Sequence, residues 1–198
     1  MDTKERIRSF LVRHRIYVNR FVIVLIAVLI AHPRNRFFFS LGFLTALVGA
    51  LVRVWARGTM PAGSQELQTS GPYRFVRHPM YLGTALEAAG VWIACASFSW
   101  AFTFLFLGIL MLSYFLFVYK EAILIEEETL YGRFRNEWLK YAKEVPAFAP
   151  HREALRAWVK EELASFHWDR FEHSKEWRNF IAFLGVFVFL WFKLVYRL

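Results

Sequence analysis

Long apolar stretches alternate with charged segments along the chain, and this alternation predicts helices that cross a membrane. The stretches lie at about 16–31, 37–54, 79–96, 100–119 and 180–196. A helix needs roughly 20 predominantly apolar residues to cross the hydrocarbon core of a bilayer. The pattern therefore predicts an all-α fold, a polytopic membrane helical bundle with about five transmembrane helices.

The segments between these spans predict how the chain is organised. Pro79 suits the first turn of a helix, because a proline has no amide hydrogen to leave unpaired there. Residues 120–144 are predicted to form a helix that leaves the membrane. Residues 151–178 are charged, with apolar residues at helical spacing, which predicts a helix on the membrane surface or against the loops. The predicted division is a core of residues 1–150, with polar segments 57–83 and 120–150, followed by residues 151–198 with the surface helix and the fifth span.

Small residues recur along the second span, at Gly42, Ala46, Gly49 and Ala50. Small side chains let two helices approach closely within a membrane. We therefore expect another helix to pack tightly against this span.

Composition and charge support a membrane protein. The chain is 57% hydrophobic with a mean hydropathy of +0.32, and its net charge is +9. The basic residues flank the apolar spans, so we expect contact with membrane lipids and no nucleic acid. Positive-inside counting predicts a multi-pass protein whose N-terminus and two polar segments are cytoplasmic. The single Cys95 excludes a disulfide framework and a cysteine metal cluster, no metal is expected, and the oligomeric state is left open.

The run Arg77-His78-Pro79-Met80-Tyr81 lies where a basic loop meets the third span. If Pro79 begins the helix, the residues around it present side chains and free backbone amides to the aqueous side. A helix N-terminus favours anionic groups such as a carboxylate. The alternative is simple anchoring at the interface, because Arg, His and Tyr are common at membrane boundaries.

A second cluster, Glu126-Glu127-Glu128, follows the fourth span. An apolar stripe comes after it, at Leu130, Phe134, Trp138, Tyr141 and Val145. At helical spacing Glu126 and Glu127 fall on either side of this stripe, whereas Glu128 points away. Carboxylates that face the protein need cationic or hydrogen-bonding partners, and the candidates are Arg77, His78 and a ligand ammonium.

Glu87 is an ionisable residue within the third span, on roughly the same face as Gly83 and Thr84. Ionisable residues in a span are costly and usually face a cavity or a partner. Glu87 is therefore predicted either to line a path for the substrate or to pair structurally with Arg53.

These clusters resemble the motifs of the isoprenylcysteine carboxyl methyltransferase family and its phospholipid methyltransferase relatives. That family carries Gly-Pro-Tyr and then Arg-His-Pro-x-Tyr-x-Gly, which read here as Gly71-Pro72-Tyr73 and Arg77-His78-Pro79-Met80-Tyr81-Leu82-Gly83. It next carries Glu-Glu-x-x-Leu, matched by residues 126–130, and Phe-Gly-x-x-Tyr-x-x-Tyr-x-x-x-Val-Pro, matched by residues 134–146. Arg135 replaces the Gly and Trp138 replaces the first Tyr. An Arg at that position predicts a different local turn or a continuous helix. The resemblance covers about residues 37–150.

The resemblance implies an integral membrane methyltransferase that uses S-adenosyl-L-methionine, with a cytosolic cofactor pocket formed by the loops and the C-terminal helical segment. It implies a lipid-like acceptor that enters from the bilayer, of the isoprenylcysteine carboxylate type. The cofactor-binding residues expected from the matched motifs are Tyr73, His78, Pro79, Tyr81, Leu82, Gly83, Glu126, Glu127 and Trp138. The catalytic candidates are Arg77, which would orient an anionic acceptor, and Glu87.

The chemistry of the residues agrees with that cofactor. Glu126 or Glu127 suits its ammonium, the helix start at His78 suits its carboxylate, and aromatic rings suit its adenine or sulfonium. Other acceptors remain open, namely a phospholipid amine or a small thiol. A membrane reductase using NADPH is a further alternative, although the paired glutamates disfavour a 2′-phosphate. A non-catalytic membrane scaffold is the last, and it leaves both motifs unexplained.

Overall fold

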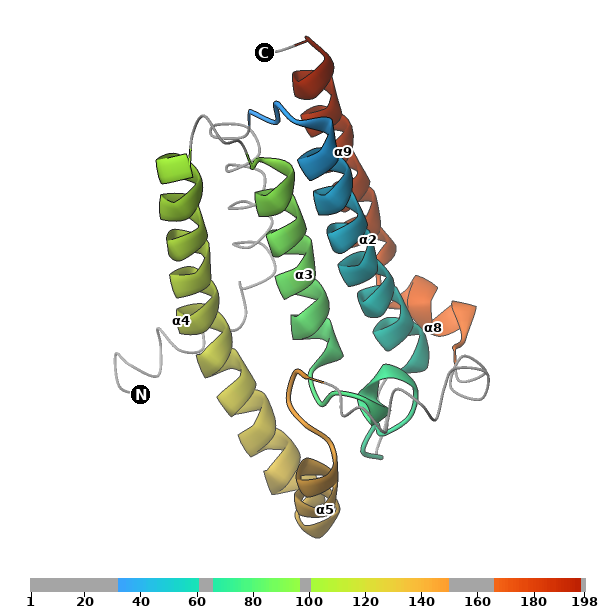
Figure 1. Ribbon diagram of the computed structural model, residues 1–198. Coiled ribbons are helices and arrows are strands. Elements are labelled where there is room, and N and C mark those ends of the chain that lie inside the picture. Colours follow the sequence, from blue (N-terminus) through green and yellow to red (C-terminus); the bar gives the residue numbers. More distant parts are fainter. Residues whose placement is uncertain (1–31, 61–65, 97–100, 150–165, 197–198) are drawn as a thin grey trace, which may run out of the picture. The chain divides into compact units, whose positions relative to one another are not determined.

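A computed structural model describes residues 32–60, 66–96, 101–149 and 166–196 of the chain. The regular elements in these ranges are all helical (Figure 1). They are α2 (Arg36–Thr59), the short 3-10 helix η1 (Gly71–Arg74), α3 (Pro79–Ala94), α4 (Ala101–Phe134), α5 (Asn136–Glu144), α8 (Trp168–His173) and α9 (Trp177–Tyr196). The predicted all-α class is confirmed for the described residues. The first predicted span, and most of the predicted surface helix, lie outside them.

Two of the described helices, α2 and α9, are long and apolar enough to cross a membrane, with mean hydropathies of 2.0 and 1.9. They coincide with the second and fifth predicted spans. Both helices carry large apolar side chains on the surface of the protein, for example Phe37 and Leu44 on α2 and Ile181 and Trp191 on α9. Such side chains suit contact with lipid tails. The third predicted span corresponds to α3, which begins at Pro79 as predicted.

The chain folds as two compact units, and several helices contribute residues to both. The described part of the first unit combines the start of α2, the end of α3, the start of α4 and the end of α9. Here α2 and α3 approach through glycines, since a Cβ atom on Gly90 would lie 2.5 Å from the backbone nitrogen of Ala46. Phe187 of α9 packs edge-on against Phe39 and Phe43 of α2. The close helix packing predicted from small residues is confirmed.

The second unit contains residues 48–86 and 126–183 and holds both sequence motifs. Gly71 opens η1 with φ of 62°, a conformation that costs glycine little. The loop after η1 is held by backbone hydrogen bonds from the amides of Arg77 and His78 to the carbonyls of Pro146 and Ala147, at 2.8 and 3.2 Å. The segment following α5 therefore fixes the approach to α3.

The predicted continuous helix over residues 120–144 is wrong. The chain instead forms one long helix, α4, from Ala101 to Phe134, and a separate helix, α5, after a break at Arg135. Arg135 has φ of 41° and ψ of −105°, a backbone conformation that residues with a Cβ atom rarely adopt. Of the two alternatives predicted for Arg in place of Gly, a different local turn and a continuous helix, the structure shows a turn at Arg135.

Arg135→Gly is expected to stabilise the protein. A non-glycine residue in a sparsely populated backbone region costs about 1–3 kcal/mol, and Arg135 is exposed, so its side chain contributes little packing in return. We expect the free energy of unfolding to rise by about 1 kcal/mol, read as a higher melting temperature in detergent. The matched control is Lys140→Gly in the exposed interior of α5, which should lower stability by about 1 kcal/mol. A lower melting temperature for Arg135→Gly would contradict the strain argument.

Residues 166–176 pack against the C-terminal end of α2 (Figure 1). The amide of His167 donates to the carbonyl of Gly58 at 2.9 Å, and Arg170 donates to the carbonyl of Thr59 at 2.9 Å. The ring of Phe166 lies directly over Gly58, where a Cβ atom would overlap it. The sequence predicted that residues 151–178 lie on the membrane surface or against the loops, and the described part of this segment packs on the end of α2.

Candidate active site

Glu127 joins the two sequence motifs. Its Oε1 lies 2.9 Å from Nε2 of His78 and 3.2 Å from Nη1 of Arg77. The His78 side chain is 1% exposed, whereas that of Glu127 is 26% exposed. The predicted pairing of the inward-facing carboxylates with Arg77 and His78 is therefore confirmed for Glu127. One carboxylate holds both side chains at the helix start.

Glu126 makes a different contact. The hydroxyl of Tyr81 donates to Glu126 Oε2 at 2.8 Å. Glu126 and Glu127 are both half-buried, and Glu128 is exposed. The helical phase predicted for the three glutamates is therefore confirmed. The start of α3 and the end of α4 are linked twice, through neighbouring carboxylates.

Aromatic rings lie beside the Arg77 side chain. The guanidinium of Arg77 lies 5.5 Å from the ring centre of Trp138, a distance that permits a cation–π contact. Trp138 is buried and packs at a tilt against Tyr141, with ring centres 5.7 Å apart. Trp138 thus lies beneath Arg77 as part of its support.

Tyr73 and Tyr141 form a second buried contact. The Tyr141 hydroxyl donates to the Tyr73 carbonyl at 2.6 Å. Burial raises the pKa of both phenols, against the opposing effect of Arg57 on Tyr73 and of Arg77 on Tyr141. Both hydroxyls therefore stay protonated and neutral at physiological pH, and the contact between α5 and η1 persists.

Some buried polar atoms of the second unit make no hydrogen bond within the part of the chain that the structure describes. They include Nδ1 of His78 and Nε of Arg77, which neighbour the groups bound to Glu127. The indole nitrogen of Trp55, whose ring lies 6.0 Å from that of Phe75, is another. A buried polar group without a partner is costly, so such atoms are suited to a polar ligand. Sequence reasoning missed Trp55, which looks like an ordinary aromatic residue of a span.

The remaining candidates lie along α3. Pro79 is fully buried as the first residue of the helix, and Leu82 is half-buried. Gly83 faces α2, where its Cβ position lies 2.6 Å from the carbonyl oxygen of Gly49, so its observed neighbours are those of helix packing. Glu87 is half-buried and belongs to the first unit. Arg53, the structural partner considered for Glu87, makes an ion pair with Glu176, a residue that the sequence did not single out.

Comparison with known proteins defines the family. The family model for phospholipid methyltransferases matches residues 37–135. The chain belongs to the phospholipid methyltransferase family. It is therefore grouped with membrane methyltransferases, and such enzymes generally use S-adenosylmethionine.

Two curated relatives are proteins of metal resistance. The chain is 31% identical over 158 residues to the nickel-cobalt-cadmium resistance protein NccN of Alcaligenes xylosoxydans xylosoxydans, covering 75% of this chain and 70% of that protein. It is 32% identical over 157 residues to the cobalt-zinc-cadmium resistance protein CzcN of Cupriavidus metallidurans, covering 75% and 69%. No solved structure matches the chain.

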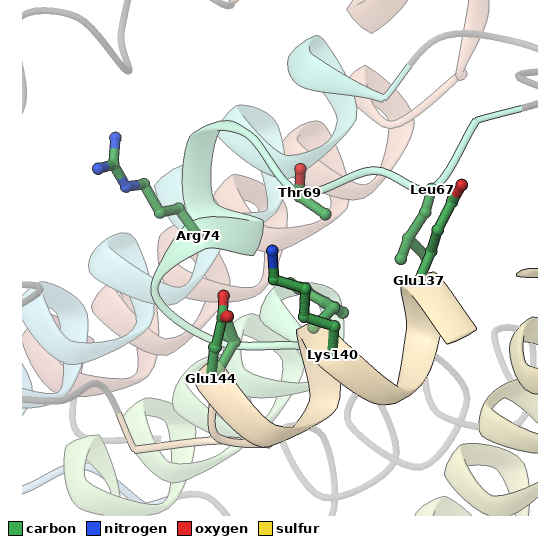
Figure 2. A pocket seen from close by; sticks show the side chains of 8 residues that line it. Leu67, Thr69, Arg74, Glu137, Lys140 and Glu144 are labelled. Carbon is green, nitrogen blue, oxygen red and sulfur yellow. The ribbon is translucent and has the colours of Figure 1, made fainter. Parts of the chain in front are cut away.

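The match to the phospholipid methyltransferase family ends at Arg135, so α5 lies beyond it. One face of α5, with Trp138 and Tyr141, contacts the motif residues described above. A second face, which also includes Tyr141, lines a groove of about 380 Å³ together with the segment before α3. Figure 2 shows this groove, with Glu137, Lys140 and Glu144 on α5 and Leu67, Thr69 and Arg74 opposite. Glu126 and Glu127 do not line it, so the groove is distinct from the cluster that Glu127 forms with Arg77 and His78.

Proposed function

We propose that this protein transfers a methyl group from S-adenosyl-L-methionine to a lipid-like acceptor in the membrane. The observation that carries the proposal is Glu127, which binds both Arg77 and His78 at the start of α3. These residues belong to the motifs within or beside the phospholipid methyltransferase match. Membership of this family supports methyl transfer over the NADPH reductase and over a non-catalytic scaffold.

The residues fit the charged end of the cofactor. Glu126 uses Oε2 to accept from Tyr81, and its second oxygen has no partner among the described residues. Glu127 is already bound by two side chains, so we assign the cofactor ammonium to Glu126. The buried Nε of Arg77 carries a hydrogen that can be donated to a carboxylate. When bound, the cofactor would supply an electrophilic methyl group on its sulfonium.

The chain itself would mainly orient the reactants and exclude water. Methyl transfer is an in-line displacement, and correct positioning can account for a large part of its acceleration. Glu127 fixes Arg77 and His78, and Trp138 stacks beneath the Arg77 guanidinium. We propose Arg77 as the group that orients an anionic acceptor. Glu87 would lie near the path of the acceptor along α3.

For the acceptor we propose a prenylated cysteine carboxylate. A carboxylate is nucleophilic without losing a further proton, whereas an amine or a thiol requires a base. The proposal is supported by the cationic Arg77 beside the cluster and by the apolar surface of the helices, which suits a lipid-like chain. A phospholipid amine or a small thiol is the alternative acceptor, and each has its own arm in the experiment below.

The purified protein, folded in nanodiscs, is expected to bind S-adenosylhomocysteine in a calorimetric titration and not NADPH. With methyl-tritiated S-adenosylmethionine, label should pass to a farnesylated cysteine derivative rather than to phosphatidylethanolamine vesicles or a small alkyl thiol. Failure of the folded protein to bind either the cofactor or its demethylated product would refute the methyltransferase proposal. Labelling of the amine or the thiol instead would refute only the acceptor.

We also propose that the protein crosses the membrane several times, with the cluster on the cytoplasmic side. The 24 residues of α2 give a length of about 36 Å, enough to cross a hydrocarbon core of about 30 Å. On a Cys95→Ser background, Ser70→Cys and Ser174→Cys should react with an impermeant maleimide from the cytoplasm. Asn35→Cys, just before α2, should react from the opposite side. Reaction of all three from one side would refute a membrane-crossing α2.

A further inference from the structure

A buried ion pair links the C-terminal part of the chain to α2. Arg53 donates through Nε to Glu176 Oε1 at 2.8 Å and through Nη2 to the same oxygen at 2.5 Å. The side chains of Arg53 and Glu176 are only 10% and 6% exposed. The second carboxylate oxygen lies 4.0 Å from Nε of Arg57. The family match ends at residue 135, and Glu176 lies 41 residues beyond it. The matched region therefore does not supply the carboxylate that pairs with Arg53.

Arg53 also contacts α3. Its Nη1 donates to the hydroxyl of Thr84, and the Thr84 hydroxyl donates in turn to the carbonyl of Met80 at 3.0 Å. Met80 lies in the first turn of α3, between Pro79 and Tyr81. A chain of hydrogen bonds therefore runs from Glu176 through Arg53 and Thr84 to the turn that presents Tyr81 to Glu126.

The approach of Arg53 to this turn depends on the absence of a side chain at Gly83. A Cβ atom there would lie 2.5 Å from Cγ and 3.2 Å from Cδ of Arg53. The Arg53 stem thus passes directly across α3, one residue before Thr84. An arginine this deeply buried needs an anionic partner to hold it there, because an unpaired buried charge carries a large desolvation cost.

We infer that Glu176 is a positioning residue for the cofactor site. Residues 166–176 pack on the end of α2 and bring Glu176 to Arg53. Arg53 then fixes the first turn of α3 and, through it, Tyr81 and His78. The inference rests on the proposed function for its consequence in binding, but the ordering of α3 can be measured without any cofactor.

The first measurement is amide hydrogen exchange of the full-length protein in nanodiscs. Glu176→Gln removes the negative charge and keeps the size of the side chain. We expect residues 82–87 of α3 to exchange on the order of tenfold faster, since weakened coupling contacts typically change local equilibria by this order. The control is Leu190→Ala, which opens a cavity at a fully buried position on α9 in the first unit. It should lower the melting temperature without changing exchange of residues 82–87.

The second measurement separates positioning from stability. In Arg53→Met/Glu176→Leu both charges are gone, and an apolar pair commonly restores the stability lost in a single variant. We expect this double variant to melt near the wild-type temperature but to bind S-adenosylhomocysteine about tenfold more weakly, because Thr84 has lost its anchor. Glu176→Gln should show the same loss.

The outcomes are distinguishable. Unchanged exchange of residues 82–87 in Glu176→Gln would overturn the inference whether or not the cofactor binds. Recovery of both stability and affinity in the double variant would also overturn it, because the ion pair would then serve stability alone. Faster exchange in Glu176→Gln, with no binding by the wild type, would support the ordering of α3 and refute the proposed methyltransferase.

Discussion

Glu126→Gln and Glu127→Gln are each expected to weaken the binding of S-adenosylhomocysteine by about one to two decades, whereas Glu128→Gln leaves it unchanged. Losing a hydrogen bond to a charged group costs about 1.5–3 kcal/mol, which corresponds to that change in affinity. Glu126 and Glu127 are half-buried against the start of α3, and Glu128 is exposed one residue later on the same helix. The measurement is a calorimetric titration of the three variants in nanodiscs.

The two inward glutamates should differ in their effect on stability. Glu127 holds both Arg77 and His78, so Glu127→Gln should lower the melting temperature as well as the affinity. Glu126 accepts a hydrogen bond from the neutral hydroxyl of Tyr81, so Glu126→Gln should act mainly on affinity. Equal losses of affinity at all three positions would contradict the helical phase. Equal losses of stability at Glu126 and Glu127 would contradict the separate roles assigned to them.

The features predicted correctly from the sequence depend on short-range geometry. The start of α3 follows from Pro79, whose missing amide hydrogen is harmless in a first turn. The inward phase of Glu126 and Glu127 follows from about 100° per residue over one or two helical turns, and this periodicity holds whatever the tertiary structure. The helical class and the close packing of α2 with α3 follow in the same way from apolar length and small residues.

The features that the sequence did not predict depend on contacts or conformations without a local signal. Arg135 adopts a backbone conformation typical of glycine, although arginine is a good helix former and its neighbours favour one continuous helix. Tertiary packing of Trp138 and Tyr141 outweighs that local preference by turning α5 back onto the motif loop. Arg53 and Glu176 are 123 residues apart, and nothing around Glu176 distinguishes it from a solvated glutamate.

Gly83→Ala is expected to disrupt the packing of α3 on α2 and to weaken cofactor binding with it. The added Cβ atom would lie 2.6 Å from the carbonyl oxygen of Gly49, and a backbone atom cannot move aside as a flexible side chain can. Overpacking of this kind typically costs 1–3 kcal/mol, more than the roughly 1 kcal/mol that alanine gains over glycine in a helix. The two helices must therefore separate, which draws Arg53 and Thr84 apart.

Gly132→Ala is the matched control, because that glycine is also helical and its Cβ position has no neighbour within 4 Å. It should raise stability by about 0.5–1 kcal/mol and leave affinity unchanged. Melting temperature and S-adenosylhomocysteine affinity of the two variants, measured side by side, test the argument. Gly83 is the last residue of the Arg-His-Pro-x-Tyr-x-Gly motif, and its neighbours are the backbone of α2 and the Arg53 stem. A Gly83→Ala variant as stable as Gly132→Ala, with wild-type affinity, would show that close approach to α2 is not the reason for glycine there.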